Sequence, residues 1–214
     1  FAKYEGLTCC TSEFIHTAGG GFYDADNQVI VDSAESVAGL QWLIDGFSKG
    51  YIPKASLEWK EEDGRNAFEA GDLLFYRQWP YQYANNKKSL GTEKFDVAAL
   101  PSIDGKPFVS TLGGHNCAIT KGSKNKATAL KFVKWWISED SERYQLETQT
   151  LAPIYGSLYD DPELLKDFPY LPILKKSLEN AKSRPQAVYY GDVTANIQDS
   201  IYPAIQQPGS RAAK

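Results

Sequence analysis

Methionine is absent from the 214 residues, and cysteine and histidine are scarce, with three and two copies. The cysteines are Cys9, Cys10 and Cys117, and the histidines are His16 and His115. No C-x-x-C pair or His pair at ligand spacing occurs, so we expect no metal site and no cofactor. Neighbouring cysteines rarely bridge each other, which leaves open a disulfide from Cys117 to either Cys9 or Cys10. The simpler interpretation is that the thiols pack as small apolar side chains.

An excess of one charge is also absent, because 23 Lys and Arg stand against 27 Asp and Glu, with the signs interspersed. Without a basic patch, we expect neither nucleic acid nor anionic lipid as a partner. No apolar run approaches the length needed to cross a bilayer, and no signal-like segment opens the chain. Because methionine is missing, we expect a processed or excised piece of a longer protein.

Aromatic residues are plentiful, with 13 Tyr, 10 Phe and 5 Trp. Residues 75–83 read FYRQWPYQY, where an apolar, strand-like segment meets Trp79 and Pro80 among tyrosines. Proline disfavours a continuing helix or central strand, so Trp79 is predicted at a strand end or in a loop. Rings with polar handles suit a ligand that is polar at its rim and apolar on its face. The alternative is an aromatic residue that caps the edge of the core.

Hydrophobic periodicity predicts an α/β chain. Strands are expected at 29–31, 72–77, 95–101 and 109–120, and residues 3–14 are expected to form a strand that runs into a turn or helix start. Helices are expected from the Ser33 cap to Gly50, at 64–71, 123–140, 141–147 and 159–168, up to a stop at Pro185, and around 193–205. Trp42, Trp135 and Trp136 fall on these helices and are interpreted as packing residues.

The order of several motifs resembles the second half of maltose/trehalose-type, family 1 extracellular solute-binding proteins of ATP-binding-cassette (ABC) sugar importers. The motifs are YEGLTCCTSEFIHTAGG, SAESVAGLQWLID, AFEAGDLLFYRQWPY and LPSIDGKPFVSTLGGHNCAITKGSKNKATALKFVKWWIS. The resemblance runs from Tyr4 to about Ala204. It depends on the order of the motifs and on the helices that fall between them.

The resemblance implies an α/β lobe of the periplasmic-binding-protein type II, maltose-binding-protein-like class, with helices packed on a mixed sheet. In that family two lobes close on a sugar. We expect residues 1–110 to belong to the second lobe, 111–150 to be a strand-helix segment of the first, and 151–207 to return to the second. Residues 208–214 are expected to be a disordered tail, and most of the first lobe is expected upstream of Phe1.

The resemblance also implies a set of sugar-binding residues. Trp79 matches a tryptophan that stacks on a pyranose ring, and Gly113, Gly114 and His115 fall in the strand that crosses between lobes. Many relatives carry Trp where His115 stands, so this part of the site is expected to differ. The complete expected set is Glu13, Trp79, Tyr81, Gly113, Gly114, His115, Arg184 and Tyr190.

The leading hypothesis is a non-enzymatic receptor that captures a di- or oligosaccharide outside the cytoplasm. The resemblance implies delivery to membrane permease subunits, with the protein in the periplasm or lipid-anchored at the outer face of the cell membrane. A glycosidase is one alternative, but it requires two facing carboxylates, which the sequence does not place together. An aromatic-rich protein-interaction domain is the other. The fragment alone is expected to bind sugar weakly and to self-associate.

Overall fold

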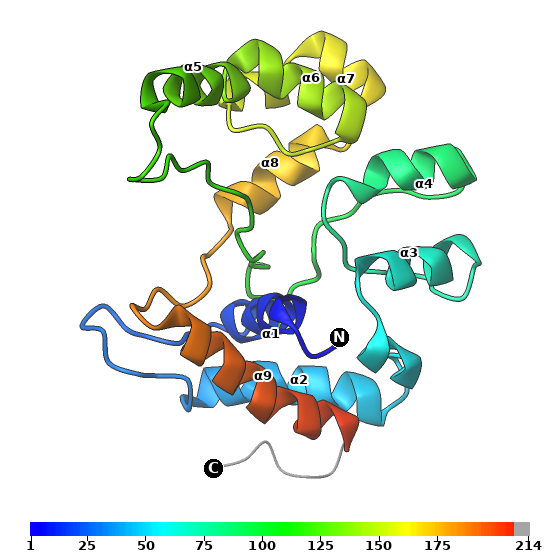
Figure 1. The fold of residues 1–214 in the computed structure, drawn as a ribbon. Coiled ribbons are helices and arrows are strands. Elements are labelled where there is room, and N and C mark those ends of the chain that lie inside the picture. Colours follow the sequence, from blue (N-terminus) through cyan, green and yellow to red (C-terminus); the bar gives the residue numbers. More distant parts are fainter. Residues whose placement is uncertain (208–214) are drawn as a thin grey trace. The chain divides into compact units, whose positions relative to one another are not determined.

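The computed structural model describes residues 1–207, so the predicted tail at 208–214 lies outside the described residues. Along this part the chain forms α1 (Glu5–Thr17), α2 (Ala34–Ser48), η1 (Lys54–Glu58), α3 (Glu61–Glu69), α4 (Gln82–Leu90), α5 (Lys126–Trp136), α6 (Glu139–Gln149), η2 (Gly156–Tyr159), α7 (Pro162–Asp167), α8 (Leu171–Glu179) and α9 (Tyr190–Gln206) (Figure 1). The chain divides into two compact units. Unit 1 comprises residues 1–76, 100–112 and 177–207, and unit 2 comprises 77–99 and 113–176. The expected division into lobes stays a prediction.

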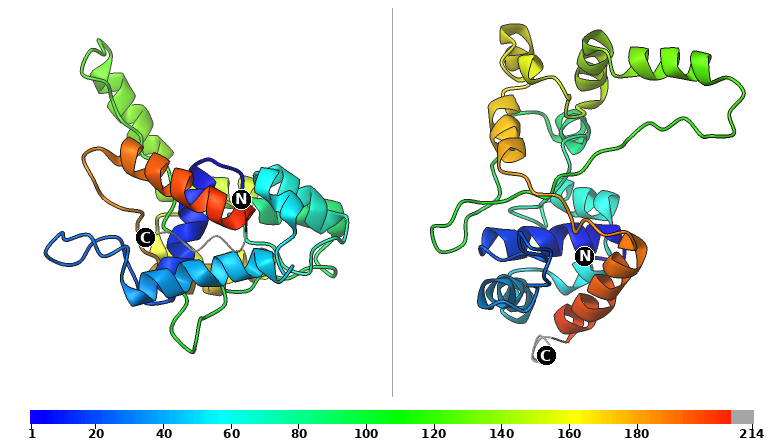
Figure 2. Two further views of the ribbon diagram at one scale, coloured as in Figure 1. Left: turned by 90° about the horizontal axis from the view of Figure 1, so that it is seen from below. Right: turned by 90° about the vertical axis from the view of Figure 1, so that its left-hand side faces the viewer.

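Unit 1 is built around α1, α2 and α9, which lie side by side (Figures 1 and 2). Leu7 of α1, Leu43 of α2 and Ile205 of α9 are each at most 1% exposed and belong to one apolar cluster. Burial of such a side chain contributes about 1.5–3 kcal/mol relative to leaving it in water. The ring of Phe1 packs edge-on against Phe47 at 5.3 Å between centroids. This cluster fixes the first turn of α1 against α9.

The expectation of a strand near residues 3–14 is wrong, because these residues enter α1. Leu7, Thr11 and Ile15 recur every fourth residue and are at most 1% exposed. The threonines and cysteines of this segment have local strand preference, which tertiary burial readily overrides. Packing of one helical face against α2 and α9 therefore makes this segment a helix rather than a strand.

The helix predicted from Ser33 to Gly50 is confirmed as α2. The Ser33 hydroxyl accepts a hydrogen bond from the backbone N–H of Ser36 at 3.3 Å, which caps the first turn. Gly50 adopts φ +75°, a conformation that glycine enters without steric cost and that ends helices. The interpretation of Trp42, Trp135 and Trp136 as packing residues is wrong for the described residues, because these side chains are 51%, 59% and 37% exposed.

Five further predicted helices are confirmed as α3, α5, α6, α7 and α9. The cap of α7 is local: Asp161 accepts hydrogen bonds from the N–H groups of Glu163 and Leu164, and Pro162 occupies the first turn. An acceptor followed by proline satisfies the free N–H groups of a helix start. These signals lie within a few residues of each other, so the sequence alone is enough to predict the start of this helix.

The expected fold of helices on a mixed sheet is wrong for the described residues. Pairing within residues 1–207 is limited to two isolated bridges, Tyr23 with Val29 and Thr111 with Lys182. A strand requires a neighbouring strand for its backbone hydrogen bonds, and segments 72–77, 95–101 and 109–120 form no ladder with one another. Leu74 and Phe75 are accordingly 90% and 89% exposed. The strand-like sequence is present without strand partners.

The helix predicted to run into Arg184 instead ends at Glu179 as α8. Its continuation pairs with another segment, because the Lys182 N–H donates to Ser110 O at 2.9 Å and Leu112 N–H donates to Lys182 O at 2.8 Å. These two bonds commit the backbone groups of Lys182 to the bridge. Arg184 therefore follows a fixed extended segment of unit 1.

Unit 2 contains α4, α5, α6, η2, α7 and the start of α8. Its buried apolar residues are Leu146, Leu158, Tyr159, Leu164, Phe168, Tyr170 and Leu171. The Thr150 hydroxyl lies 3.1 Å from Pro80 O and 3.3 Å from Ala84 N, which ties the end of α6 to the start of α4. By contrast, α5 has no buried residue. No described helix has both the length and the apolar character of a membrane span.

Candidate functional site

Trp79 lies at the turn that starts α4, as the Trp-Pro dipeptide predicts. Its carbonyl accepts a hydrogen bond from Gln82 N–H at 3.1 Å, and Pro80 O accepts one from Tyr83 N–H at 3.0 Å. The indole is half-buried, and the guanidinium carbon of Arg77 lies 4.1 Å from its ring centroid. A cation over an indole face is an attractive contact. The turn thus holds an aromatic surface beside a strong hydrogen-bond donor.

Gly113 allows the edge of Trp79 to approach the backbone. A Cβ atom placed on Gly113 would lie 2.8 Å from Cζ3 of Trp79, a distance that requires something to shift. The structure therefore brings together two residues that lie 34 positions apart in the sequence. The next residue, Gly114, adopts φ +126°, and His115 is exposed. Tyr81 is half-buried, and its carbonyl accepts a hydrogen bond from the Thr150 hydroxyl at 3.2 Å.

In unit 1, Arg184 and Tyr190 meet at the carboxylate of Glu5. The Arg184 guanidinium and the Tyr190 hydroxyl both donate to Glu5 Oε1, and the Thr194 hydroxyl donates to Oε2 at 2.7 Å. Thr194 also contacts the Thr8 hydroxyl at 2.7 Å. Sequence analysis missed Glu5. The available signal was an acidic residue in the first turn of a helix, where a carboxylate is favoured by the helix dipole.

Electrostatics favour a charged Glu5. Partial burial alone would raise the pKa of this carboxyl, but hydrogen bonds from Tyr190, Thr194 and Arg184 outweigh burial and hold the pKa below its ordinary value. Burial and the bond to Glu5 raise the pKa of the Tyr190 phenol. The cluster therefore combines a fixed carboxylate with oriented donors, which is the chemistry that binds hydroxyl groups.

Glu13 is buried and 7% exposed. Its Oε1 accepts a hydrogen bond from the N–H of Thr111 at 3.2 Å, while the Thr111 hydroxyl donates to Cys9 O at 2.8 Å. Both bonds fasten α1 to the segment that pairs with Lys182. Glu13 therefore supports the chain that leads to Arg184.

The eight predicted site residues divide between the two units. Unit 1 holds Glu13, Arg184 and Tyr190, and unit 2 holds Trp79, Tyr81, Gly113, Gly114 and His115. Within the described residues, no group of three His, Cys, Asp or Glu could hold a metal ion. Cys9 is buried, Cys117 is exposed, and no disulfide links the three cysteines.

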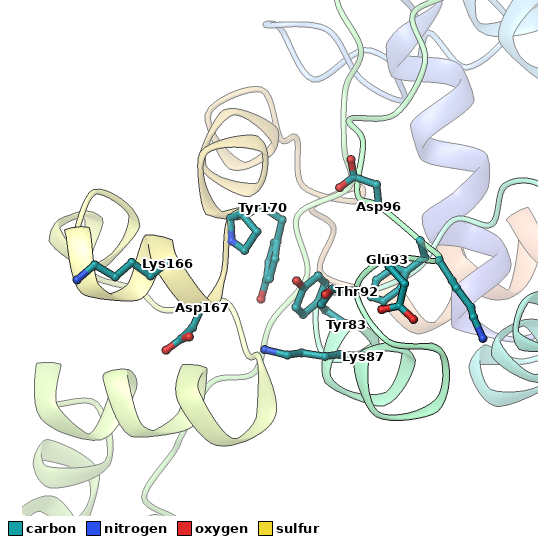
Figure 3. Close-up of a pocket in the computed structure, with 11 residues that line it drawn as sticks. Tyr83, Lys87, Thr92, Glu93, Asp96, Lys166, Asp167 and Tyr170 are labelled. Atoms are coloured by element: carbon teal, nitrogen blue, oxygen red, sulfur yellow. The ribbon is translucent and has the colours of Figure 1, made fainter.

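Unit 2 also contains an open pocket of about 680 Å³ that includes none of the predicted residues (Figure 3). The rings of Tyr83 and Tyr170 lie against each other in it, with centroids 4.3 Å apart, and Phe95 meets Tyr83 edge-on at 5.4 Å. Lys87, Asp96 and other charged residues of both signs form the rim. Burial raises the pKa of the Tyr170 phenol, so this hydroxyl stays protonated at neutral pH.

The sequence and fold define a member of a known class of proteins. Residues 6–179 match the family model of the bacterial extracellular solute-binding proteins, and the chain belongs to this family. The resemblance seen in the motif order is thereby confirmed. The matched region extends from α1 through α8.

The chain is similar to several named proteins. The chain is 33% identical over 206 residues to a probable ABC transporter-binding protein of Deinococcus radiodurans, a match that covers 94% of this chain and 49% of that protein. It is 26% identical to a maltotriose-binding protein of Pyrococcus abyssi, covering 91% of this chain and 43% of that protein. The solved structure of maltose-bound MalE3 of T. maritima is 32% identical, with a TM-score of 0.89 over 99% of this chain and 56% of that chain. This chain thus spans about half the length of the proteins that it matches.

Proposed function

We propose that this chain forms part of a sugar-binding receptor of an ABC importer, and that Trp79 supplies the stacking surface. The observation that carries the proposal is the arrangement of Trp79 against Gly113 and beside Arg77, within a chain similar along nearly its whole length to a maltose-bound protein. Sugars present C–H faces and hydroxyl rims, which match an indole flanked by a guanidinium.

The energetics of such a site are consistent with capture of a dilute sugar. Stacking a pyranose on Trp79 would remove about 50–100 Å² of apolar surface, a gain of roughly 1–3 kcal/mol. A micromolar site requires about 8 kcal/mol. The remainder must come from hydrogen bonds of about 1 kcal/mol each, so several donors and acceptors are needed.

Arg184 is the proposed donor of unit 1, and Tyr190, whose one hydroxyl proton is donated to Glu5, is a proposed acceptor; Glu5 orients both. Arg184 can engage a hydroxyl through the guanidinium N–H groups that do not face Glu5, because the side chain offers five donors in a planar fork. In this proposal Glu13 acts indirectly, through the backbone that it holds. Gly113, Gly114 and His115 would border the sugar beside Trp79, and Tyr81 would flank it.

The proposed receptor is not an enzyme, works outside the cytoplasm, and passes its sugar to membrane permease subunits. The extracellular family supports the location, and the relative described as an ABC transporter-binding protein supports the permease partner. We further propose that the receptor lies in the periplasm or is held at the outer face of the cell membrane by a lipid anchor.

The test uses a hybrid protein, in which this chain is joined to the residues of the T. maritima relative that lie outside the match. Calorimetric titration of the hybrid with maltose, maltotriose and trehalose should give binding heat with at least one sugar, and chromatography should find that sugar intact. Hydrolysis products would favour a glycosidase. Absence of binding heat with every sugar, under conditions in which the hybrid is folded, would overturn the proposal.

A further inference from the structure

One face of α1 holds a short segment of unit 1 in place. Cys9, Glu13 and Thr17 recur every fourth residue of α1, so they lie along one face at steps of about 6 Å. Their exposed fractions are 4%, 7% and 3%. The segment that they hold is residues 109–112, which we call the clamped segment. Buried polar groups require hydrogen-bond partners, and this segment supplies them.

The clamped segment is fastened to α1 at two points. At the first, the Thr17 hydroxyl accepts a hydrogen bond from the N–H of Val109 at 3.1 Å. At the second, the Glu13 carboxylate accepts one from the N–H of Thr111 at 3.2 Å, and the Thr111 hydroxyl donates to Cys9 O at 2.8 Å. The two anchored residues are two positions apart, which is about 6.6 Å in an extended chain and matches one step along the face of α1.

The backbone of the clamped segment also pairs with the chain that leads to Arg184. Thr111 and Lys182 form a parallel bridge. In this bridge the Lys182 N–H donates to Ser110 O at 2.9 Å, and the Leu112 N–H donates to Lys182 O at 2.8 Å. Thr111 is 4% exposed and links two elements, because its own N–H and hydroxyl bind α1 while its two neighbours bind Lys182.

This bridge lies close in sequence to two residues of the candidate site. Arg184 follows Lys182 by two positions, and Gly113 follows Thr111 by two positions. Consecutive Cα atoms are about 3.8 Å apart, so a residue two positions from a held one has a limited range of movement. A shift of the Gly113 backbone would change the surface against which the Trp79 ring rests.

We propose that Thr111 is a positioning residue for sugar binding. Its hydrogen bonds to α1 fix the backbone that continues into Gly113, and the bridge to Lys182 fixes the backbone that continues into Arg184. The role rests on the proposed function, in which Trp79 stacks on the sugar and Arg184 donates to it. Thr111 acts through these residues and does not touch the sugar, because it is buried.

The first test needs no sugar and measures hydrogen exchange in this chain. Thr111→Val keeps the shape of the side chain and removes its hydroxyl. The amides of Leu112 and Lys182 should then exchange about tenfold faster, while the amide of Leu43, in the core of unit 1, keeps its rate. Thr111→Ser should restore slow exchange, because it returns the hydroxyl. Unchanged rates in Thr111→Val, or an equal acceleration at Leu43, would overturn the proposal.

A spectroscopic measurement follows the effect to Trp79. The chain is labelled with 5-fluorotryptophan, and Trp79→Phe assigns the resonance. Thr111→Val should shift or broaden this resonance, and Thr111→Ser should return it. Ser36→Ala is the matched control, because the Ser36 hydroxyl is fully buried and its bonds to Gly21 and Ile30 lie elsewhere in unit 1. A Trp79 resonance that Thr111→Val leaves unchanged, or that Ser36→Ala moves as much, would contradict the proposal.

Titration of the hybrid with maltose measures the consequence for binding. Thr111→Val should weaken binding by about tenfold, whereas Thr111→Ser and Ser36→Ala should bind as the parent does. Equal affinity of Thr111→Val and the parent would overturn the positioning role. If the hybrid binds no sugar, the proposed function fails, but hydrogen exchange and the fluorine resonance still decide whether Thr111 holds the backbone. If Thr111→Val does not fold, Thr17→Val, which removes the hydroxyl at the other contact, replaces it in all three measurements.

Discussion

Trp79 and Gly113 are in contact because Gly113 has no side chain: its Cβ would stand 2.8 Å from the indole Cζ3. The indole edge rests against this backbone, while Arg77 covers the ring at 4.1 Å. One edge and one face of the tryptophan are thus defined by residues on either side of it in the sequence. A ring held in this way is preorganised for stacking, which reduces the entropy lost on binding.

Gly113→Ala should move the Trp79 ring and weaken binding of maltose by the hybrid by about tenfold, the equivalent of 1.4 kcal/mol. Gly122→Ala is the matched control, because no atom lies within 4 Å of its added Cβ. Calorimetric titration of both variants measures the difference. Equal affinities for the two variants would show that the contact between Gly113 and Trp79 has no part in binding.

Glu5→Gln should lower the free energy of unfolding at pH 7 by about 1–2 kcal/mol, because a charged acceptor of three hydrogen bonds becomes neutral. The folded state lowers the pKa of Glu5, so its contribution is present above the ordinary glutamate pKa and is lost as pH falls through the lower, folded value. The variant should therefore lose less stability than the parent on acidification.

The matched control for Glu5 is Glu35→Gln, which changes an exposed carboxylate in the first turn of α2. Urea denaturation at pH 7 and at acidic pH measures both variants. An equal and small effect of the two substitutions would mean that Glu5 contributes only a solvated charge.

His16 should make unit 1 sensitive to mild acid. Burial, with a smaller effect of Lys182, lowers its pKa from 6.5 to about 4. The unfolded chain takes up a proton at His16 below pH 6.5, and the folded chain does so only near pH 4. Stability is therefore full above pH 6.5 and falls as pH drops toward 4, by up to about 3 kcal/mol.

Removal of the His16 imidazole isolates this effect. His16→Gln should flatten the dependence of the unfolding free energy on pH between 6.5 and 4, whereas His115→Gln, at an exposed histidine, should preserve it. Urea denaturation in steps across this pH range provides the slopes. If the unfolding free energy of His16→Gln depends on pH as steeply as that of the parent, other groups cause the acid sensitivity.

The parts of the fold that the sequence predicts are those with local causes. Ser33 and Asp161 cap helices through bonds that span two or three residues, and Gly50 ends α2 by its own backbone conformation. The segment of α1 was misassigned because its threonines and cysteines favour a strand locally, and only packing against α2 and α9 makes it a helix. The prediction of a mixed sheet was wrong for a related reason, because a strand forms only where a distant segment supplies its backbone hydrogen bonds.

The residues of the candidate site also divide into those with local sequence signals and those that depend on distant contacts. Trp79 was identified from its own neighbourhood, because a Trp-Pro dipeptide among tyrosines is visible in nine residues. Glu5 and Arg184 are 179 positions apart in the sequence, and no residue near Glu5 indicates that the two side chains are in contact. The order of motifs supplied what periodicity could not, namely the class of protein.

The most direct test of the central claim is a titration of maltose into the hybrid, its Trp79→Ala variant and this chain alone. We expect a measurable dissociation constant for the hybrid and a loss of affinity of about tenfold or more on removing the indole, from the roughly 1–3 kcal/mol of stacking. We expect this chain alone to bind at least about a hundredfold more weakly, because three or four hydrogen bonds of about 1 kcal/mol each are missing. Unchanged affinity in Trp79→Ala, or equal dissociation constants for hybrid and chain, would contradict it.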